Sequence, residues 1–222
     1  MINQALIQFL QGIQQHNEKE WYDEHKEEYK TLRSEFTRFI EELGQEITQF
    51  DPAVAKAYQV GKPITKIFRI HRDARFSKNK AKYKTNISGF IAAGIKNDSQ
   101  PAYYVSIEPG GRSYVGGGLF RPERLILSAV RDHIEMHPKT LAKIDQSKKL
   151  RAEFPAGLNR AHALKTAPRG HDVEHEAIEY LRLKSFTVGK TISDAELQKT
   201  DFSNSIRQSF KALEPLNAFL RP

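Results

Sequence analysis

The sequence predicts an α+β protein with one antiparallel sheet of roughly five strands, flanked by N-terminal, central and C-terminal helices. Three observations support this class. Segments with helical apolar spacing lie before and after a group of short strand-like segments. Hairpin-length turns connect the middle strand-like segments, and strands do not alternate regularly with helices, which disfavours a doubly wound parallel sheet. No linker-like composition interrupts the 222 residues, so residues 1–222 are expected to form a single domain.

The N-terminal part of the chain has the spacing of amphipathic helices. Residues 3–15 carry apolar side chains on one helical face. Asn17, with Glu20 three residues later, has the pattern of a capping box, and apolar residues then recur every three or four positions as far as Phe50. The pattern predicts a long helix that ends before Asp51-Pro52, followed by a connection over 53–63.

Short apolar-alternating segments predict the strands, at 65–70, 87–95, 102–108, 112–119 and 184–191. Pro109-Gly110-Gly111 predicts a tight reversal between two of them. Pro122 stands where the first position of a helix is expected. The remaining helices are expected at 122–137, 139–149, 174–182 and 202–220, the last bent or ended near Pro215, and Ser193 with Glu196 forms a second capping-box pattern.

Composition excludes several classes of protein. The chain is 39% hydrophobic with 13 Phe and 8 Tyr, enough to fill a core, so a disordered chain is not expected. The absence of cysteine excludes disulfides, thiol catalysis and cysteine-based metal centres. No apolar run is long enough to span a membrane, and the N-terminus lacks the features of a secretory signal, so we expect a cytoplasmic protein without a membrane partner.

The net charge of +8 is unevenly distributed, and this unevenness indicates a candidate site. Between Lys62 and Lys84 there are nine Lys or Arg residues and one acid, Asp73. An anionic ligand would offset the repulsion among these cations, as would water and salt around an exposed loop. Arginine binds phosphate or carboxylate through two parallel hydrogen bonds, and lysine adds charge. The candidate ligand-binding residues of this segment are Arg69, Arg72, Arg75, Ser77, Lys78, Lys80, Tyr83 and Lys84.

A second candidate is the glycine-rich segment from Gly116 to Arg121. A glycine-rich strand-to-helix junction brings backbone N–H groups close to an anion, which makes Gly116, Gly118 and Arg121 candidates for ligand binding. The segment lacks the P-loop and dinucleotide-binding patterns. The alternative is that the glycines permit a bulge or close packing.

No metal or cofactor is expected. His171 and His175 would share a helical face, but Gly170 and Asp172 place the start of the helix inside this segment, which spoils the geometry. Acid–base chemistry would have to recruit Asp73, His71, Tyr83 or Glu108, and nothing in the sequence selects among them. Asp73 and His71 in the basic segment are the candidate catalytic residues.

Several long motifs resemble a known family. FRIHRDARFSKNKAKYKTN resembles the RDxRFSKDKxPYKT signature of the family catalogued as domain of unknown function 2461. EWYDEHKEEY at 20–29, YYVSIEPGGRSYVGGGLFRPE at 103–123 and EYLRLKSFTVGK at 179–190 resemble its other motifs, and the resemblance covers nearly the whole chain. Asn79 and Ala81 stand where the family usually has Asp and Pro. The resemblance links the basic segment and the glycines with Lys184, and it implies no activity.

These observations lead to one functional hypothesis with two alternatives. The leading hypothesis is a site for a phosphate-bearing or polyanionic ligand, either an anionic small molecule or a nucleic acid, built from 69–84, the 116–121 turn and Lys184. The first alternative is a hydrolase or transferase that acts on a phosphorylated substrate. The second is a protein-interaction module with a basic face, whose partner the sequence does not identify.

Overall fold

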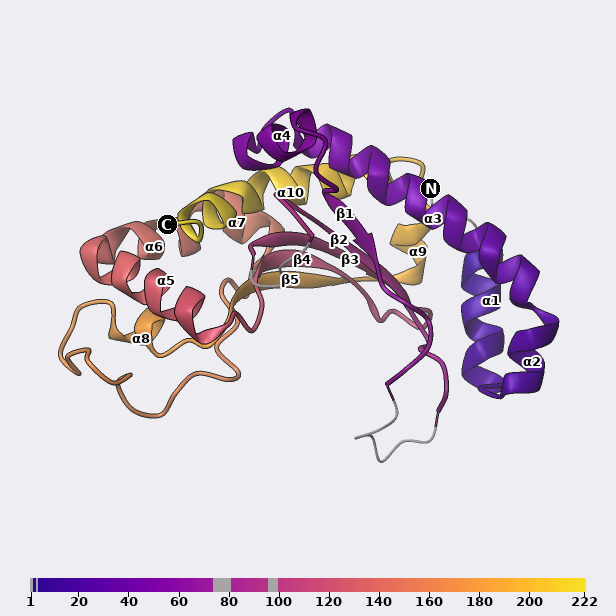
Figure 1. The fold of residues 1–222 in the computed structure, drawn as a ribbon, viewed down its shortest axis with the longest axis horizontal. Helices are drawn as coiled ribbons and strands as arrows, with labels where there is room; N and C mark the ends of the chain where they lie inside the picture. The colour runs from indigo at the N-terminus through magenta and orange to yellow at the C-terminus, as the bar shows by residue number, and fades with distance from the viewer. Residues whose placement is uncertain (1, 3, 74–80, 96–99) are drawn as a thin grey trace.

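The computed structural model describes residues 2, 4–73, 81–95 and 100–222, and it shows a five-stranded sheet with helices packed on one face (Figure 1). Every strand is antiparallel to its neighbour, and the spatial order follows the chain: β1 Thr65–Ile67, β2 Ile87–Ala92, β3 Ala102–Ile107, β4 Ser113–Leu119 and β5 Phe186–Ile192. The predicted α+β class with a single domain and an antiparallel sheet is confirmed.

The two long helices that cover the sheet are α3 (Lys26–Ile47) and α10 (Phe202–Phe219). Side chains alternate between the two faces of a strand, so Ile91 and its register partner Tyr103 point together toward these helices, and both are fully buried. Phe210 of α10 packs on the Tyr103 ring, with 5.1 Å between ring centroids. The core therefore lies between this sheet face and the two helices.

Several of the other helices lie around the ends of this layer, while α7 packs beside α10 (Figure 1). α1 and α2 stand at one end, and α5, α6 and α8 at the other. Across the part of the chain that the structure describes, no helix covers the second face of the sheet. The bounds of the helices other than α3 and α10 are α1 Gln4–Gln15, α2 Lys19–Glu24, α4 Pro52–Gln59, α5 Arg124–Met136, α6 Pro138–Asp145, α7 Lys148–Glu153, α8 Ile178–Leu181 and α9 Asp194–Leu197.

The predicted N-terminal helix is interrupted and is followed by a helix that the sequence pattern missed. His25 ends α2 and precedes α3, and its ring stacks on Trp21 with 3.9 Å between centroids. The segment predicted as a connection over 53–63 contains most of α4. Asp51 caps this helix by accepting hydrogen bonds from the N–H groups of Ala53 and Val54. A helix this short is stabilised by its cap, and it contains too few apolar repeats for helical periodicity to be detected in the sequence.

Several boundaries in the second half also differ from the predictions. Pro122 lies before α5, which begins at Arg124. The segment 139–149 is divided between α6 and α7, because Ser147 caps a new helix. The helix predicted over 174–182 is limited to α8. The capping box of Ser193 and Glu196 is confirmed, and α10 continues past Pro215.

Candidate functional site

The face of the sheet that no described helix covers contains a cavity of about 760 Å³. This volume is in the range of small-molecule sites, roughly 300–1,000 Å³. We call it the sheet cavity. Its walls come from all five strand regions and from the turn after β4, and the residues that line it are Phe68, Lys84, Asn86, Ser88, Phe90, Ala92, Gln100, Ala102, Tyr104, Tyr114, Gly117, Gly118, Phe120, Arg121, Asn159, Thr187 and Val188.

Four of these side chains form a continuous row of rings, which we call the aromatic row: Phe68, Phe90, Tyr104 and Tyr114. Phe90 and Tyr104 are register partners on neighbouring strands. The Phe68 ring contacts both, with centroid distances of 5.8 Å to Phe90 and 6.4 Å to Tyr104. Tyr104 lies 6.2 Å from Tyr114. Because side chains on one face of a sheet lie at alternate positions, four separate strand regions together build one aromatic surface.

Glycines let the last ring of the row lie against the backbone. A Cβ atom on Gly189 would stand 1.9 Å from the Tyr114 hydroxyl oxygen and 2.1 Å from its Cζ. A Cβ on Gly116 would stand 3.1 Å from the same ring. Tyr114 thus occupies the space that a side chain at Gly189 would need, whereas a Cβ on Gly116 would meet the β5 backbone first, at 2.3 Å from the Val188 carbonyl oxygen. The glycine-rich sequence of β4 serves close packing here.

Two cations line the sheet cavity, and no carboxylate does so among the residues that the structure describes. Lys84 Nζ lies 5.4 Å from the centroid of the Phe68 ring. Burial lowers the pKa of Lys84, and the nearby charge of Arg72 lowers it further. The protonated amine therefore stands in a partly dry, apolar wall beside a second positive charge. A bound anion would offset both effects.

The second cation, Arg121, belongs to an unusual turn at the end of β4. Its φ of 45° is in the left-handed region, where a residue with a side chain is strained. The Arg121 N–H donates to Ser185 Oγ at 2.9 Å, which holds the turn against the start of β5. The guanidinium carbon lies 5.2 Å from the ring centroid of Phe120, which is 62% exposed. The turn presents an arginine and an aromatic ring at the rim of the sheet cavity.

The position of Lys84 depends on a two-stranded arm that extends from β1 and β2. Lys84 N–H donates to the Ile70 carbonyl at 2.7 Å, and Arg72 N–H donates to the Lys82 carbonyl at 2.9 Å. His71 and Tyr83 form an isolated antiparallel bridge in the same arm. The described parts of the basic segment on either side, up to Asp73 and from Ala81 onward, thus run antiparallel to each other.

Asn17 and Tyr22 fix this arm from the N-terminal helices. Tyr83 N–H donates to Asn17 Oδ1 at 2.9 Å, and Asn17 Nδ2 donates to the Tyr83 carbonyl at 3.1 Å. The Tyr22 and Tyr83 rings stack with 4.3 Å between centroids. The predicted helix cap at Asn17 is wrong, because its side chain pairs with the arm and Glu18 occupies the cap position of α2.

Replacing Asn17 with alanine is expected to lower the free energy of unfolding by about 1–3 kcal/mol, because two backbone groups of Tyr83 lose their partner. Urea unfolding measures this change. Asn204→Ala serves as the control, since Asn204 is exposed on α10. A loss no larger than that of the control, within about 0.5 kcal/mol, would show that Asn17 does not fix the arm.

Comparison with known proteins identifies the family of this chain. Residues 5–219 match the family described as "Conserved hypothetical protein (DUF2461)". The chain belongs to this family. The match includes the arm, all residues of the sheet cavity and the helices that hold them, so the whole site lies inside the DUF2461 region. No curated protein and no solved structure matches the chain.

The predicted ligand-binding residues of this DUF2461 member separate into three groups. Lys84, Gly118 and Arg121 line the sheet cavity together. Gly116 lies beneath Tyr114. The others that the structure describes, Arg69, Arg72, Tyr83 and Lys184, do not line the cavity.

Physical reasons separate these residues from the cavity. Tyr83 is buried against Tyr22, while Arg69 and Lys184 are exposed. Arg72 is close enough to Lys84 to affect its pKa. Arg75, Ser77, Lys78 and Lys80 lie outside the described residues. Gly116–Gly118 pair with β3 on one side and with β5 on the other. A central strand uses its backbone N–H and C=O groups for hydrogen bonds within the sheet. The contacts of these glycines therefore agree with the alternative of close packing.

The two candidate catalytic residues lie on the arm. The His71 ring packs 5.2 Å from Tyr83 and 5.5 Å from Tyr22, and Asp73 is exposed. Neither residue lines the sheet cavity. The aromatic row is the main feature that sequence reasoning missed. The sequence signal for this row was the alternation of residues along two segments, 66–70 and 88–90, which puts Phe68 and Phe90 each on one face of its strand. Alternation alone does not show which face of the sheet the helices leave uncovered.

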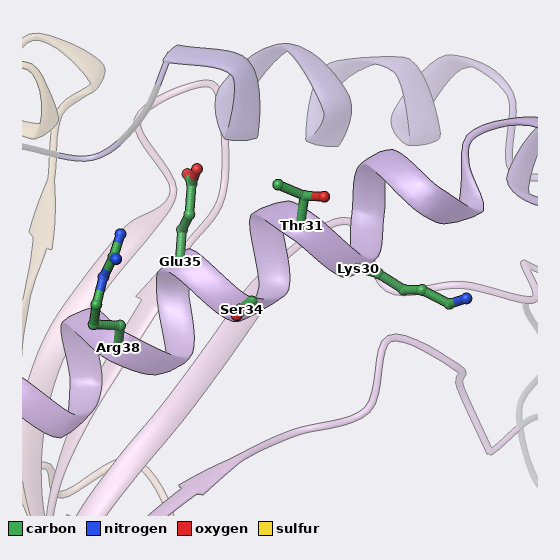
Figure 2. Close-up of a pocket in the computed structure, with 5 residues that line it drawn as sticks. All are labelled: Lys30, Thr31, Ser34, Glu35 and Arg38. Atoms are coloured by element: carbon green, nitrogen blue, oxygen red, sulfur yellow. The ribbon is translucent and has the colours of Figure 1, made fainter.

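Two other features of the described chain lack the convergence of side chains that a site needs. A hollow of about 480 Å³ lies on α3, lined by Lys30, Thr31, Ser34, Glu35 and Arg38 (Figure 2). All five side chains come from one helix; Glu35 and Arg38 point the same way and Lys30 points away from them, so the five do not converge on a ligand. His171 Nδ1 lies 3.4 Å from Glu135, whereas His175 Nδ1 accepts from Ala177 N–H, so these two imidazoles make separate contacts.

Within the described residues, no helix combines the length and apolar character needed to cross a membrane.

Proposed function

We propose that the protein binds a phosphate-bearing ligand with a planar ring, of the nucleotide type, in the sheet cavity. The observation that carries the proposal is the composition of the cavity wall, which combines an aromatic row with two cations and, among the described residues, no carboxylate. Aromatic faces stack on planar rings, and cations neutralise phosphate. The net charge of the whole chain, +8, also favours an anionic partner.

Lys84 is the phosphate-binding residue that the geometry favours most. It lies at the junction of the arm and the sheet, and within the described residues no carboxylate pairs with it. Because burial lowers its pKa, a phosphate that enters the cavity recovers the charge stabilisation that the amine lacks. Asn86 and Ser88 line the same wall and supply neutral hydrogen-bonding groups.

No reaction is part of this proposal. The enzyme hypothesis requires a base next to the bound phosphate, and neither Asp73 nor His71 lines the cavity. The interaction-module hypothesis requires a flat basic face, whereas the cations and rings here line a concave site. A cytoplasmic location accords with a nucleotide-type ligand and remains part of the proposal.

Thermal unfolding and calorimetric titration with uridine monophosphate, uridine and inorganic phosphate test the proposal. We expect the nucleotide to stabilise the protein more than either fragment, because only the nucleotide uses both the rings and the cations. Lys84→Met keeps the length of the side chain and removes its charge, and it should weaken nucleotide binding at least about tenfold.

Lys82→Met is the matched control. Lys82 lies two residues away on the same arm, is exposed and does not line the sheet cavity. Its replacement should leave binding within about twofold of the unmodified protein. Equal effects of the two substitutions, or equal stabilisation by uridine and its monophosphate, would contradict a phosphate site at Lys84.

A further inference from the structure

The sheet cavity offers more ring surface than one nucleotide can use. The aromatic row crosses from the end of β1 to β4. Phe90 within it is buried, whereas Phe68, Tyr104 and Tyr114 are partly exposed, and Phe120 adds an exposed ring at the rim. A base stacks on one such ring at a time, so a mononucleotide leaves most of the row unused. The row suits a ligand with several planar groups in sequence.

The cations stand at opposite corners of the sheet. Thr85 Oγ1 donates to Glu108 Oε1 at 2.9 Å, which places Lys84 near the end of β3 that Ile107 occupies. Gly118 pairs with Ala102 at the other end of β3, and Arg121 follows it. The two ends of β3 are roughly 17 Å apart along the strand direction. Lys84 precedes β2 and Arg121 follows β4, and these two strands lie roughly 10 Å apart across the sheet. A ligand with a repeated phosphate can place one phosphate group beside each of these two positions.

A third cation lies over the row itself. Lys66 Nζ is 5.6 Å from the centroid of Phe90, and Lys84 stands over Phe68 in the same way. Interleaved cations and rings are the pattern that binds single-stranded nucleic acid, with phosphates on the cations and bases on the rings. A duplex does not fit this chemistry, because its bases are stacked on each other and their faces are covered.

On the basis of the proposed function, we infer that the ligand of the sheet cavity is a single-stranded nucleic acid segment of a few nucleotides. Its bases stack on the aromatic row, and its backbone runs from Lys84 toward Arg121. The flat position of Tyr114 over Gly116 and Gly189 keeps the last ring low against the sheet, which leaves space above it for a base. RNA and DNA share this chemistry, and the experiment compares them.

Competition against a fluorescently labelled octathymidylate tests the inference, with thymidine oligonucleotides of one to eight units and the matching uridine series as competitors. Affinity should rise by roughly 5- to 150-fold for each base that gains a ring, and then level off at a few units. A third series of 2′-deoxyuridine oligonucleotides differs from the uridine series only in the 2′-hydroxyl and shows whether that group contributes. Equal competition by the mononucleotide and the octamer would overturn this inference and leave the proposed function standing. Absence of binding in all three series would overturn both.

Substitution separates stacking from charge. Tyr104→Leu removes a ring of the row and keeps an apolar side chain, so octamer affinity should fall by roughly tenfold. Tyr104→Phe should keep it. Tyr58→Leu is the control, because Tyr58 is half-exposed on α4, away from the cavity. Thermal unfolding verifies that each variant is folded. If Tyr104→Leu binds as the control does, or if an abasic octamer competes as well as octathymidylate, stacking on the row is refuted.

Discussion

Replacing Gly118 with alanine should lower the free energy of unfolding by roughly 3–5 kcal/mol, because strain and a backbone clash add at this position. Gly118 has a φ of 108°, which a residue with a side chain rarely adopts. Its Cβ would stand 2.0 Å from the carbonyl oxygen of Phe186 and 3.0 Å from Thr187 Cα. Both neighbours are backbone atoms of β5, so relief of the clash requires β4 and β5 to separate.

Gly111→Ala distinguishes the clash from the strain. Gly111 also has a positive φ, 68°, but no atom lies within 4 Å of the position its Cβ would take. Its replacement should cost only about 1–2 kcal/mol. Urea unfolding of the two variants gives the comparison. If Gly118→Ala is no more destabilised than Gly111→Ala, close packing of β4 on β5 is not the reason for the glycine.

The second large effect is expected at Asp51, whose replacement with alanine should cost about 3–5 kcal/mol. The carboxylate is fully buried. Both of its oxygens lie 2.9 Å from Arg221 nitrogens, and the Tyr103 hydroxyl donates to it at 2.7 Å. It also caps α4. Removal of this side chain leaves a guanidinium that is only 18% exposed and a buried hydroxyl without their partner.

Asp51 also makes stability depend on pH. Burial by itself would raise the pKa of Asp51, but the hydrogen bonds and charge of Arg221, with the Tyr103 hydrogen bond, lower the pKa below its ordinary value of 3.8. A carboxyl with a lowered pKa in the folded state contributes stability above its unfolded pKa. This contribution should decline as the pH falls below about 4 and through the folded pKa.

Two controls accompany this prediction. Asp51→Asn keeps a side chain able to cap α4 but removes the charge, so it should lose the acid-dependent part of stability. Glu179→Ala removes the partner of Arg182 in an exposed ion pair and should cost less than about 1 kcal/mol. Similar losses for Asp51→Ala and Glu179→Ala in chemical unfolding would mean that the buried pair does not hold the C-terminal residues to α4.

Local patterns were sufficient to predict the class of fold. The alternation in β2 and β3, the Pro109-Gly110-Gly111 turn and the capping box at Ser193 depend on near neighbours in the chain, and the structure agrees with each of them. Helix boundaries were less predictable where a tertiary contact decided them. Asn17 has the composition of a cap, yet the backbone of Tyr83, distant in sequence, takes its hydrogen bonds.

The candidate site was only partly predictable for the same reason. Lys84, Gly118 and Arg121 were selected from charge and glycine content, and they line one cavity. Tyr83 was selected from the same motif, but the bridge to His71 places it toward Tyr22. A one-residue step along an extended strand reverses the direction of a side chain, so neighbours in a motif are sent to opposite sides.

The antiparallel sheet, the flanking helices and the position of the basic segment could all be predicted from the amino-acid sequence, because helical and strand periodicity and local charge are properties of short stretches of chain. Tertiary structure alone decided which sheet face α3 and α10 cover and which one contains the cavity. It also decided that Phe68, Phe90, Tyr104 and Tyr114 form one row. Cross-strand neighbours depend on register and on the packing of distant helices, and neither is a property of any single segment.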